Sequence, residues 1–442
     1  MSTLLNKISA ANFGCVFGQL ISPRKLQAVV RTYRRSPAGV RPRVRPYDLI
    51  LGMVFHALLP WGLLSTHIEQ VSGKRLCDSS VSQRRQGMGW ELFVELLDSI
   101  LAWVGVEKTH PHAFYKGLRI VGIDGSTWSV SNTPPIKASS KKARSRRRRA
   151  AFFRLSMTAI YELGMHNPLA ARIGLKGESE MALATGLLPS IKAGWLLLAD
   201  RYYGFGKFVF LLLALESKPS FILRVRKNIK SNPIERLSDG SCLIRIHNPV
   251  TGEYVIVREI HARVYRRPGH WISVRLWTNL LNPKHHPAKE LVRLYALRWD
   301  QELAYKELKI HLRRSPLLLS HTVVTAAQEI VCLLIAQALI ARVRMTAAQS
   351  GHPSSVLEIS FSNTLNVFRS LWFFTALFEA ILPQDILPKL VSRALDVLAD
   401  HPSRARRHRS CPRAVRQPIG PWPRLLRNAS STGAFQYEIC RK

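Results

Sequence analysis

The apolar pattern between residues 118 and 227 limits the possible folds more than any other feature of this chain. Three short apolar runs follow one another, with the sequences RIVGIDGSTWSV, RLSMTAIYELGM and PLAARIGLKG. Runs of this length that end at turn residues predict β-strands. Helical spacing over residues 178–191, the run WLLLAD, helical spacing over 205–216 and the run SFILRVRK complete the series. We therefore predict an α/β fold built on a mixed sheet.

The order of these elements is itself informative. Three consecutive strands, a helix, a strand, a helix and a fifth strand follow the order of a ribonuclease-H-like fold, and this inference uses no motif. Residues 229–280 alternate apolar and polar side chains, which predicts a β-rich insertion. Helical spacing returns in one long stretch over residues 287–312. We therefore assign residues 118–228 and 281–312 to a ribonuclease-H-like catalytic core that the insertion interrupts.

A helical region precedes this core. Helices are predicted from Pro23 and over residues 47–58, 66–71, 79–86 and 91–104. The helices on either side of Gly73 could form a helix-turn-helix, with Ser82, Gln83, Arg84 and Arg85 on the second helix. A plain helical hairpin is the alternative. We expect residues 1–110 to form a helical DNA-binding region.

The segments after the core are predicted to be helical at first and then irregular. Residues 313–400 show helical spacing, most clearly over 326–344. Residues 401–442 carry many arginines among prolines and serines, so we predict a flexible basic tail.

The balance of charge points to a polyanionic partner. The chain has 65 Lys and Arg against 28 Asp and Glu, which gives a formal net charge of +37. Solubility does not need so large an excess, and nucleic acid is the favoured partner over a membrane surface or a ribosome. The run KKARSRRRR at residues 141–149 lies between the first two predicted strands. It is predicted to contact DNA phosphates, with a merely solvated loop as the alternative.

Other classes of protein are disfavoured. The six cysteines are scattered, with no zinc-like spacing. The first residues show no secretory signal pattern, and the longest apolar run in a helical setting, 330–341, is too short to span a bilayer. We therefore expect a cytoplasmic protein without a membrane segment.

Two aspartates stand where predicted strands end. Asp124 follows the apolar run VGI, and Asp200 ends WLLLAD. Neighbouring strand ends in a mixed sheet would bring the two carboxylates close together, and a divalent cation would offset their repulsion. Either aspartate alone could be an ordinary turn or cap residue, so the pair carries more weight than either member.

A third acid is found in the long helical stretch. Tyr295, Arg298, Glu302 and Lys309 would share one narrow stripe, about 60° wide, if residues 287–312 formed a single helix. On an ordinary surface helix the same stripe would be plain ion pairing. Asp300 and Glu307 would point elsewhere on that helix, so we reject them as the third acid.

These motifs together resemble a known family. The arrangement Y-x2-R-x3-E-x6-K, downstream of IDGS and LLLADRYYGFGKF, is similar to the YREK signature of the DDE transposases of the insertion-sequence-four family. The resemblance covers about residues 118–312, and the segment DSSVSQRRQGMGWELF also resembles the N-terminal region of such enzymes.

The resemblance implies a cut-and-paste DNA transposase. It implies that Asp124, Asp200 and Glu302 bind two Mg²⁺ or Mn²⁺ ions, and that Tyr295, Arg298 and Lys309 contact DNA at the ends of the mobile element. It further implies a homodimer on DNA in a prokaryotic cytoplasm, associated with the nucleoid. The alternatives are a catalytically inactive or domesticated DNA-binding relative and a basic RNA-binding protein.

Overall fold

A computed structural model describes most of the chain. The described residues are 23–32, 44–59, 61–139, 152–248, 251–267, 270–313, 315–350, 355–378, 383, 386–402, 414–415, 424–425 and 437–440. They belong to two compact units. The first unit takes residues 1–114, 124–190 and 300–403, and the second takes 115–123, 191–299 and 404–442. The basic run 141–149 lies outside the described residues, so its predicted DNA contact stays a prediction.

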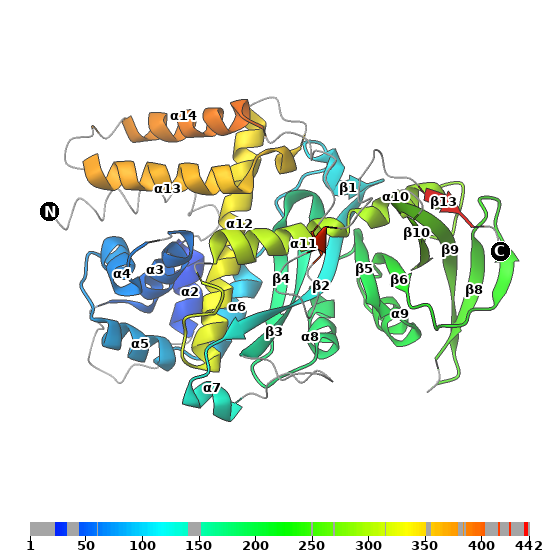
Figure 1. The fold of residues 1–442 in the computed structure, drawn as a ribbon, viewed down its shortest axis with the longest axis horizontal. Coiled ribbons are helices and arrows are strands. Elements are labelled where there is room, and N and C mark those ends of the chain that lie inside the picture. The colour runs from blue at the N-terminus through cyan, green and yellow to red at the C-terminus, as the bar shows by residue number, and fades with distance from the viewer. Residues whose placement is uncertain are drawn as a thin grey trace. The chain divides into compact units, whose positions relative to one another are not determined.

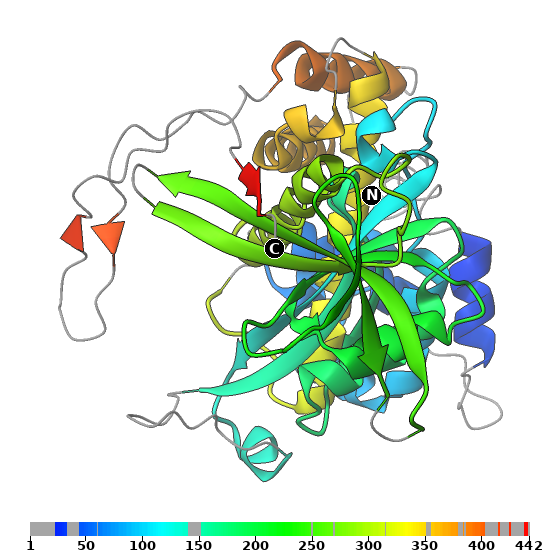
Figure 2. The same cartoon turned by 90° about the vertical axis from the view of Figure 1, so that its right-hand side faces the viewer.

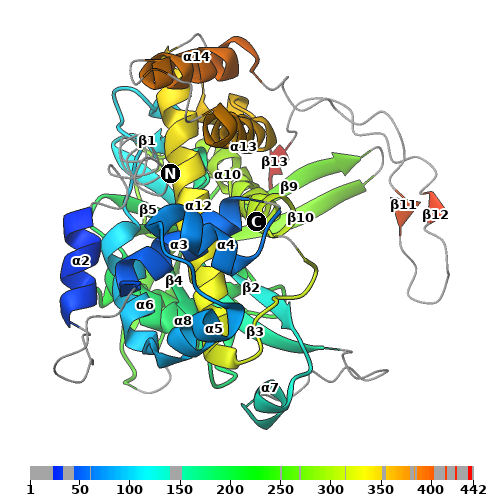
Figure 3. The ribbon, with the colours of Figure 1, turned by 90° about the vertical axis from the view of Figure 1, so that its left-hand side faces the viewer.

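The N-terminal part of the first unit is helical, as predicted (Figure 3). Its helices are α2 (Pro23–Thr32), α3 (Pro46–Leu58), α4 (Leu64–Ser72), α5 (Asp78–Gly87) and α6 (Trp90–Ile100). Helix α3 begins after Arg45, whose backbone N–H and guanidinium both donate to the carboxylate of Asp48 in the first turn. Helix α4 ends at Gly73, whose φ of 66° is one that glycine adopts without strain. Both helices of the predicted helix-turn-helix are therefore present.

One long helix, α12 (Val323–Ser350), forms the core of the first unit (Figure 1). It packs against α3, α6, the strand β4 (Asn167–Ile173), α13 (Phe361–Phe378) and α14 (Ile386–Asp400). Its apolar stretch 323–349 is long enough to cross a membrane, which corrects the expectation drawn from the shorter run 330–341. However, 89% of that stretch is buried inside the protein, as expected for a core helix.

The strands of the first unit pair in the order β4-β3-β2. They are β2 (Leu118–Val130), of which residues 124–130 belong to this unit, β3 (Phe153–Glu162) and β4. The buried carboxylate of Glu162, at the end of β3, accepts hydrogen bonds from the backbone N–H groups of Val104 and Gly105. This contact fixes the segment after α6 against the sheet. The short elements here are η1 (Pro111–Ala113), α7 (Pro134–Ser139), η2 (Leu163–Met165), α8 (Glu180–Leu187), η3 (Leu188–Ser190) and η5 (Val356–Glu358).

The second unit contains the rest of the predicted core strands together with the insertion. Its strands follow the order β2-β5-β6-β10-β9-β8-β7, in which the first three are parallel neighbours and the others pair antiparallel. They are β5 (Trp195–Gly204), β6 (Ser220–Val225), β7 (Pro233–Arg236), β8 (Cys242–His247), β9 (Tyr254–Arg267) and β10 (His270–Thr278), with helices α9 (Gly206–Leu213) and α10 (Ala288–Ala296). The strand β1 (Phe114–Tyr115) pairs with β2. The mixed α/β prediction and the β-rich insertion are confirmed.

Residues 437–439, within the predicted flexible tail, form a strand. Strand β13 (Tyr437–Ile439) pairs antiparallel with β9, where Tyr437 lies opposite Val264, and Figure 2 shows it beside the long β9–β10 hairpin. Ala414–Val415 and Arg424–Leu425 form a second small pair, β11 and β12. The prediction is wrong for β13, because an edge of β9 offers backbone partners that a local reading of the sequence cannot detect.

The long helix predicted over residues 287–312 is broken into three pieces. Helix α10 ends at Ala296, helix α11 (Trp299–Lys306) follows, and a π-helical turn, η4 (Glu307–Leu312), completes the stretch. At the break, the N–H groups of Leu297 and Arg298 bond to carbonyls three residues back, which tightens the chain out of α-helical geometry. The single-stripe prediction is therefore wrong as geometry, since it assumed one unbroken helix.

Two adjacent residues of β9 bury opposite charges in the insertion. Arg258 is fully buried and donates to Ser241 and to the backbone carbonyls of Leu280 and His286. Glu259 is also fully buried. It accepts hydrogen bonds from Trp277 at 2.9 Å and Ser231 at 2.8 Å.

The pKa of Glu259 follows from this environment. Burial alone would raise it, but bonds from His261, Trp277 and Ser231 and the charge of Arg275 hold the pKa near 2. The insertion is thus held together by satisfied buried charges as well as by apolar packing.

We expect Glu259→Gln to lower the free energy of unfolding by about 3 kcal/mol, because it leaves Arg275 without its buried counter-charge. Denaturant unfolding at pH 7 measures the loss, and the exposed Glu253→Gln is the matched control. A carboxylate with a depressed pKa stabilises the fold above its ordinary pKa of 4.5 and loses that effect as the pH falls towards about 2. The wild type should lose more stability than Glu259→Gln across that range. Equal losses in the two proteins would contradict the assignment.

Candidate active site

Parallel pairing of β2 and β5 determines where the two aspartates lie. The register runs from Arg119 opposite Trp195 to Ile123 opposite Ala199. Asp124 and Asp200 are the residues that follow this last pair. Each has a local hydrogen bond: Asp124 Oδ1 accepts from the N–H of Gly125 at 2.9 Å, and Asp200 Oδ1 accepts from that of Tyr202 at 2.7 Å. Asp124 and Asp200 therefore directly follow the β2–β5 pairing. The prediction that they stand at strand ends is wrong, because β2 continues to Val130 and β5 to Gly204.

In the second unit, Asp200 lies near three further polar side chains. Burial raises the pKa of Tyr295 to about 12, the cations of Arg298 and Arg224 oppose that rise, and the carboxylate of Asp200 adds to it. Arg298 also places its guanidinium 5.4 Å from the centre of the exposed Trp299 ring. The structure thus groups Tyr295, Arg298 and Asp200. Arg224 joins them from β6, and the sequence reading did not select it, because its strand shows no motif.

In the first unit, helix α11 is docked on the strand that carries Asp124. The hydroxyl of the buried Tyr305 donates to the backbone carbonyl of Asp124 at 2.6 Å. Gln301 Nε2 donates to the backbone carbonyl of Ala159 on β3 at 3.0 Å. Glu302 follows Gln301 on this helix and is half-buried. Two anchors on one helix therefore fix the backbone from which Glu302 projects.

Lys309 lies on the π-helical turn of the same unit. Its Nζ donates to the backbone carbonyl of Thr127 at 2.7 Å and sits 5.1 Å from the centre of the Trp128 ring. Burial lowers the pKa of Lys309 to about 8, and the cations of Arg313 and Arg154 lower it further. Lys309 thus contacts Thr127 and Trp128, which follow Asp124 on β2. Tyr295 and Arg298 belong to the other unit.

A hollow of about 290 Å³ opens beside this part of β2. Its walls combine hydroxyls, an acid and a cation, namely Gly125, Ser126, Thr127, Ser156, Met157, Glu180 and Lys309. Glu180 was not selected from the sequence, because a glutamate at a helix start is common and no motif surrounds it. Among the residues that the structure describes, no group of three or more His, Cys, Asp or Glu is arranged as a ready metal site.

Glu307, which the sequence reading rejected as the third acid, has a different environment. Its carboxylate is 2.9 Å from His166 Nδ1 and 3.3 Å from a guanidinium nitrogen of Arg344. All three side chains are largely buried, and the interactions with His166 and Arg344 help to lower the pKa of Glu307 against the effect of burial. Glu307 therefore holds η4 against α12.

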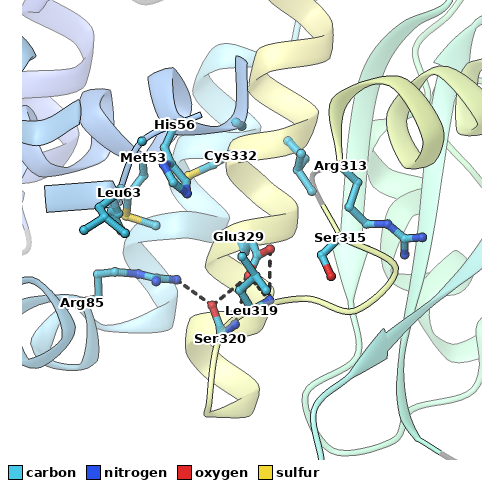
Figure 4. Close-up of a pocket in the computed structure, with 14 residues that line it drawn as sticks. Met53, His56, Leu63, Arg85, Arg313, Ser315, Leu319, Ser320, Glu329 and Cys332 are labelled. Atoms are coloured by element: carbon cyan, nitrogen blue, oxygen red, sulfur yellow. Dashed lines mark hydrogen bonds between the residues drawn. The ribbon is translucent and has the colours of Figure 1, made fainter. Parts of the chain in front are cut away.

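The second helix of the predicted helix-turn-helix is attached to α12 by an arginine. Figure 4 shows Arg85 reaching from α5 to Ser320, at the edge of a cavity of about 490 Å³. The guanidinium donates to Ser320 Oγ at 3.0 Å and to the carbonyl of Thr325 at 2.8 Å. Ser320 Oγ in turn donates to Glu329, whose pKa burial raises. Arg85 thus stabilises the fold, while Ser82 and Gln83 on the same helix are exposed.

The comparisons with known proteins agree with this architecture. A family model described as the transposase DDE domain matches residues 115–339, just over half of the chain. The chain therefore belongs to the DDE transposase family. Over 291 residues it is 26% identical to the transposase InsG of insertion sequence element IS4 from Escherichia coli K12. This confirms the family resemblance seen in the sequence.

The extent of these similarities is limited. The match to InsG covers 63% of this chain and 65% of that protein, so the chain spans less than two thirds of the relative's length. Among solved structures, the piggyBac transposase in a synaptic complex with hairpin DNA aligns with 89% of this chain and 85% of its own. The TM-score is 0.44 and the identity is 12%, a level that supports no comparison of individual residues.

Replacing Arg85 tests whether this residue is structural. We expect Arg85→Met to lower the free energy of unfolding by about 2 kcal/mol, since it removes charge-assisted hydrogen bonds to Ser320 and Thr325. Urea unfolding measures the change. Gln83→Ala, on the exposed side of α5, should stay within about 0.5 kcal/mol of the wild type. A variant at position 85 that unfolds like the wild type would rule out this anchoring role.

Proposed function

We propose that this protein is a DNA transposase that cuts at the inverted repeats ending its own element and joins the ends to target DNA. The observation that carries the proposal is the β2–β5 register, in which Asp124 and Asp200 directly follow the paired residues Ile123 and Ala199. Residues at matching positions of two paired parallel strands present their side chains to the same face of the sheet. Because the chain belongs to the DDE family, we infer that these two acids act in phosphodiester chemistry.

Glu302 is the third acid in this proposal. It lies on α11, which Tyr305 attaches to the backbone of Asp124. The neighbouring Glu307 is less suitable as the third acid, because its carboxylate is already bound to His166 and Arg344. The broken helix no longer supports Glu302 by a shared stripe, so its support comes from this docking and from the YREK resemblance.

The donor set suits divalent metal ions, which DDE transposases use. Asp124, Asp200 and Glu302 offer only carboxylate oxygens, the hard ligands that Mg²⁺ and Mn²⁺ prefer. The hollow lined by Gly125, Ser126 and Lys309 begins at the residue that follows Asp124. We propose two Mg²⁺ ions per site, with Mn²⁺ as a possible substitute. When bound, such ions make a water nucleophilic and stabilise the leaving oxygen.

The protein's own residues bind and orient the DNA in this mechanism. Arg298 presents a planar fork to phosphate oxygens, and Lys309 presents a point charge. Tyr295 packs beside Arg298 and keeps its phenol protonated at neutral pH. Lys309 is held in place by the carbonyl of Thr127, so its position is set before DNA arrives. In the joining step the freed 3′-OH occupies the place of the water, and no covalent enzyme intermediate is needed.

The partner in this proposal is DNA, both at the element's ends and at the target. The net charge of +37 supplies the attraction, which should weaken steeply with salt. Because two ends must be held together, we infer a homodimer on DNA, acting at the nucleoid in a prokaryotic cytoplasm.

Removing any one acid tests the proposed reaction. We expect Asp124→Asn, Asp200→Asn and Glu302→Gln each to reduce Mg²⁺-dependent cleavage of element-end DNA by at least about a thousandfold, since each removes a charge that holds the ions. Binding of the same DNA, measured by gel shift, should remain. The neighbour Asp300→Asn is the control and should cleave normally. Cleavage retained in one variant would remove that residue from the site.

The lowered pKa of Lys309 predicts a pH dependence. A lysine with a pKa near 8 loses its charge as the pH rises through 8, so binding of end DNA should weaken between pH 7 and 9. In Lys309→Arg the charge persists, and that part of the weakening should disappear. Fluorescence anisotropy at constant ionic strength measures both. Identical pH profiles for the two proteins would exclude a DNA contact by a titrating Lys309.

A further inference from the structure

We propose that Glu180 is a fourth acidic residue of the catalytic centre, acting beside Asp124 on the same metal ions. This inference rests on the proposed transposase function. Glu180 is the first residue of α8 and belongs to the same unit as Asp124, Glu302 and Lys309. Neither the family match nor the sequence motifs assign it a role.

The contact between Glu180 and Gly125 is the first observation. A Cβ placed on Gly125 would lie 2.2 Å from Cδ and 2.4 Å from Oε2 of Glu180. The carboxyl group of Glu180 therefore rests directly on the Cα of the residue that follows Asp124. A side chain at position 125 would push this carboxyl away, and the backbone of Gly125 has no left-handed φ that would otherwise call for glycine. Glycine at this position thus keeps space for an acid.

The environment of Tyr305 is the second observation. Tyr305 is buried and donates its hydroxyl to the backbone carbonyl of Asp124. The same helix, α11, carries Glu302, and the residue after Asp124 is Gly125, on which the carboxyl of Glu180 rests. The contacts of Tyr305 and Glu180 therefore meet at two consecutive residues of β2. The two acids approach one point of the fold from a strand and from a helix.

The hollow of about 290 Å³ is the third observation. Glu180 and Lys309 both line it, with Ser126 and Thr127 between them along β2. Because a water molecule takes about 30 Å³ of liquid, the hollow can hold a hydrated cation together with a phosphate group. An acid and a cation lining one hollow suit this combination better than either charge alone.

The charge balance of the centre favours a fourth acid. Two divalent ions carry more positive charge than Asp124, Asp200 and Glu302 can neutralise, and phosphate is present only when DNA is bound. A carboxylate at Glu180 would supply the remaining charge before DNA arrives. It would hold an ion directly or through one of the ion's water ligands, as hydrogen-bonded outer partners do.

A simpler explanation has to be separated from this proposal. An acid in the first turn stabilises a helix by its interaction with the helix dipole, and Glu180 occupies such a place. Helix α8 already has a cap, since Ser179 Oγ accepts from the N–H of Ala182 at 3.2 Å. Moreover, a glutamate that only stabilised the helix would not need to reach Gly125.

Binding of Mn²⁺ to the full-length protein, followed by the electron paramagnetic resonance of free Mn²⁺, tests the proposal without cleavage. Glu180→Gln should weaken Mn²⁺ binding by about tenfold or more. Glu180→Asp keeps a charge at the helix start but shortens the reach by one methylene, so it too should bind Mn²⁺ more weakly. Glu178→Gln is the matched control, because Glu178 precedes the helix and accepts from the N–H of Lys176 instead. It should bind like the wild type.

The outcomes distinguish this inference from the proposed function. Wild-type Mn²⁺ affinity in Glu180→Asp or in a folded Glu180→Gln would overturn the role of Glu180, and thermal melting shows whether each variant is folded. Asp124→Asn serves as the reference for the centre itself. If it also bound Mn²⁺ like the wild type, the metal centre of the proposed function would fail. If Asp124→Asn lost binding while the Glu180 variants kept it, only the fourth acid would be excluded.

Discussion

The parallel pairing of β2 with β5 is the interaction on which the rest of the candidate site depends. Its backbone hydrogen bonds run from Arg119 and Trp195 to Ile123 and Ala199, and an aspartate directly follows this last pair on each strand. A slip of one residue would turn every following side chain to the opposite face of the sheet. The apolar residues of both strands are fully buried along this register, so burial as well as hydrogen bonding opposes such a slip.

The buried helix α12 supports the elements around Asp124. Gln337 on this helix is fully buried and links two of them, because its side-chain N–H donates to the carbonyl of Ala304 on α11 and its oxygen accepts from Tyr161 on β3. Unsatisfied polar groups at such depth would be costly, which makes the arrangement specific. A helix that is apolar enough for a membrane thus serves as the scaffold against which α11 and the sheet are positioned.

The parts of the fold that could be predicted were those with local signals. The strands that carry Asp124 and Asp200 have apolar runs before these residues that any neighbouring sheet would bury, so their positions followed from pattern alone. The break after Ala296 could not be predicted, because the helical spacing continues through it and the change lies in the backbone bonds of Leu297 and Arg298. For the same reason the prediction that Tyr295 and Glu302 share one helical stripe followed from their spacing but is wrong, because the two residues lie on separate helices.

The sequence by itself determined the order of the elements, the two aspartates that follow apolar runs, the excess of positive charge and the resemblance to a transposase family. These properties depend on residue type and on spacing between near neighbours, which a linear chain records directly. Only the tertiary structure decided that Arg85 anchors a helix, that Glu307 is engaged by Arg344, and that Glu180 rests on Gly125. Each of these contacts joins residues that are distant in the chain, and the same charged side chain can bind a ligand or hold the fold, depending on what packing places beside it.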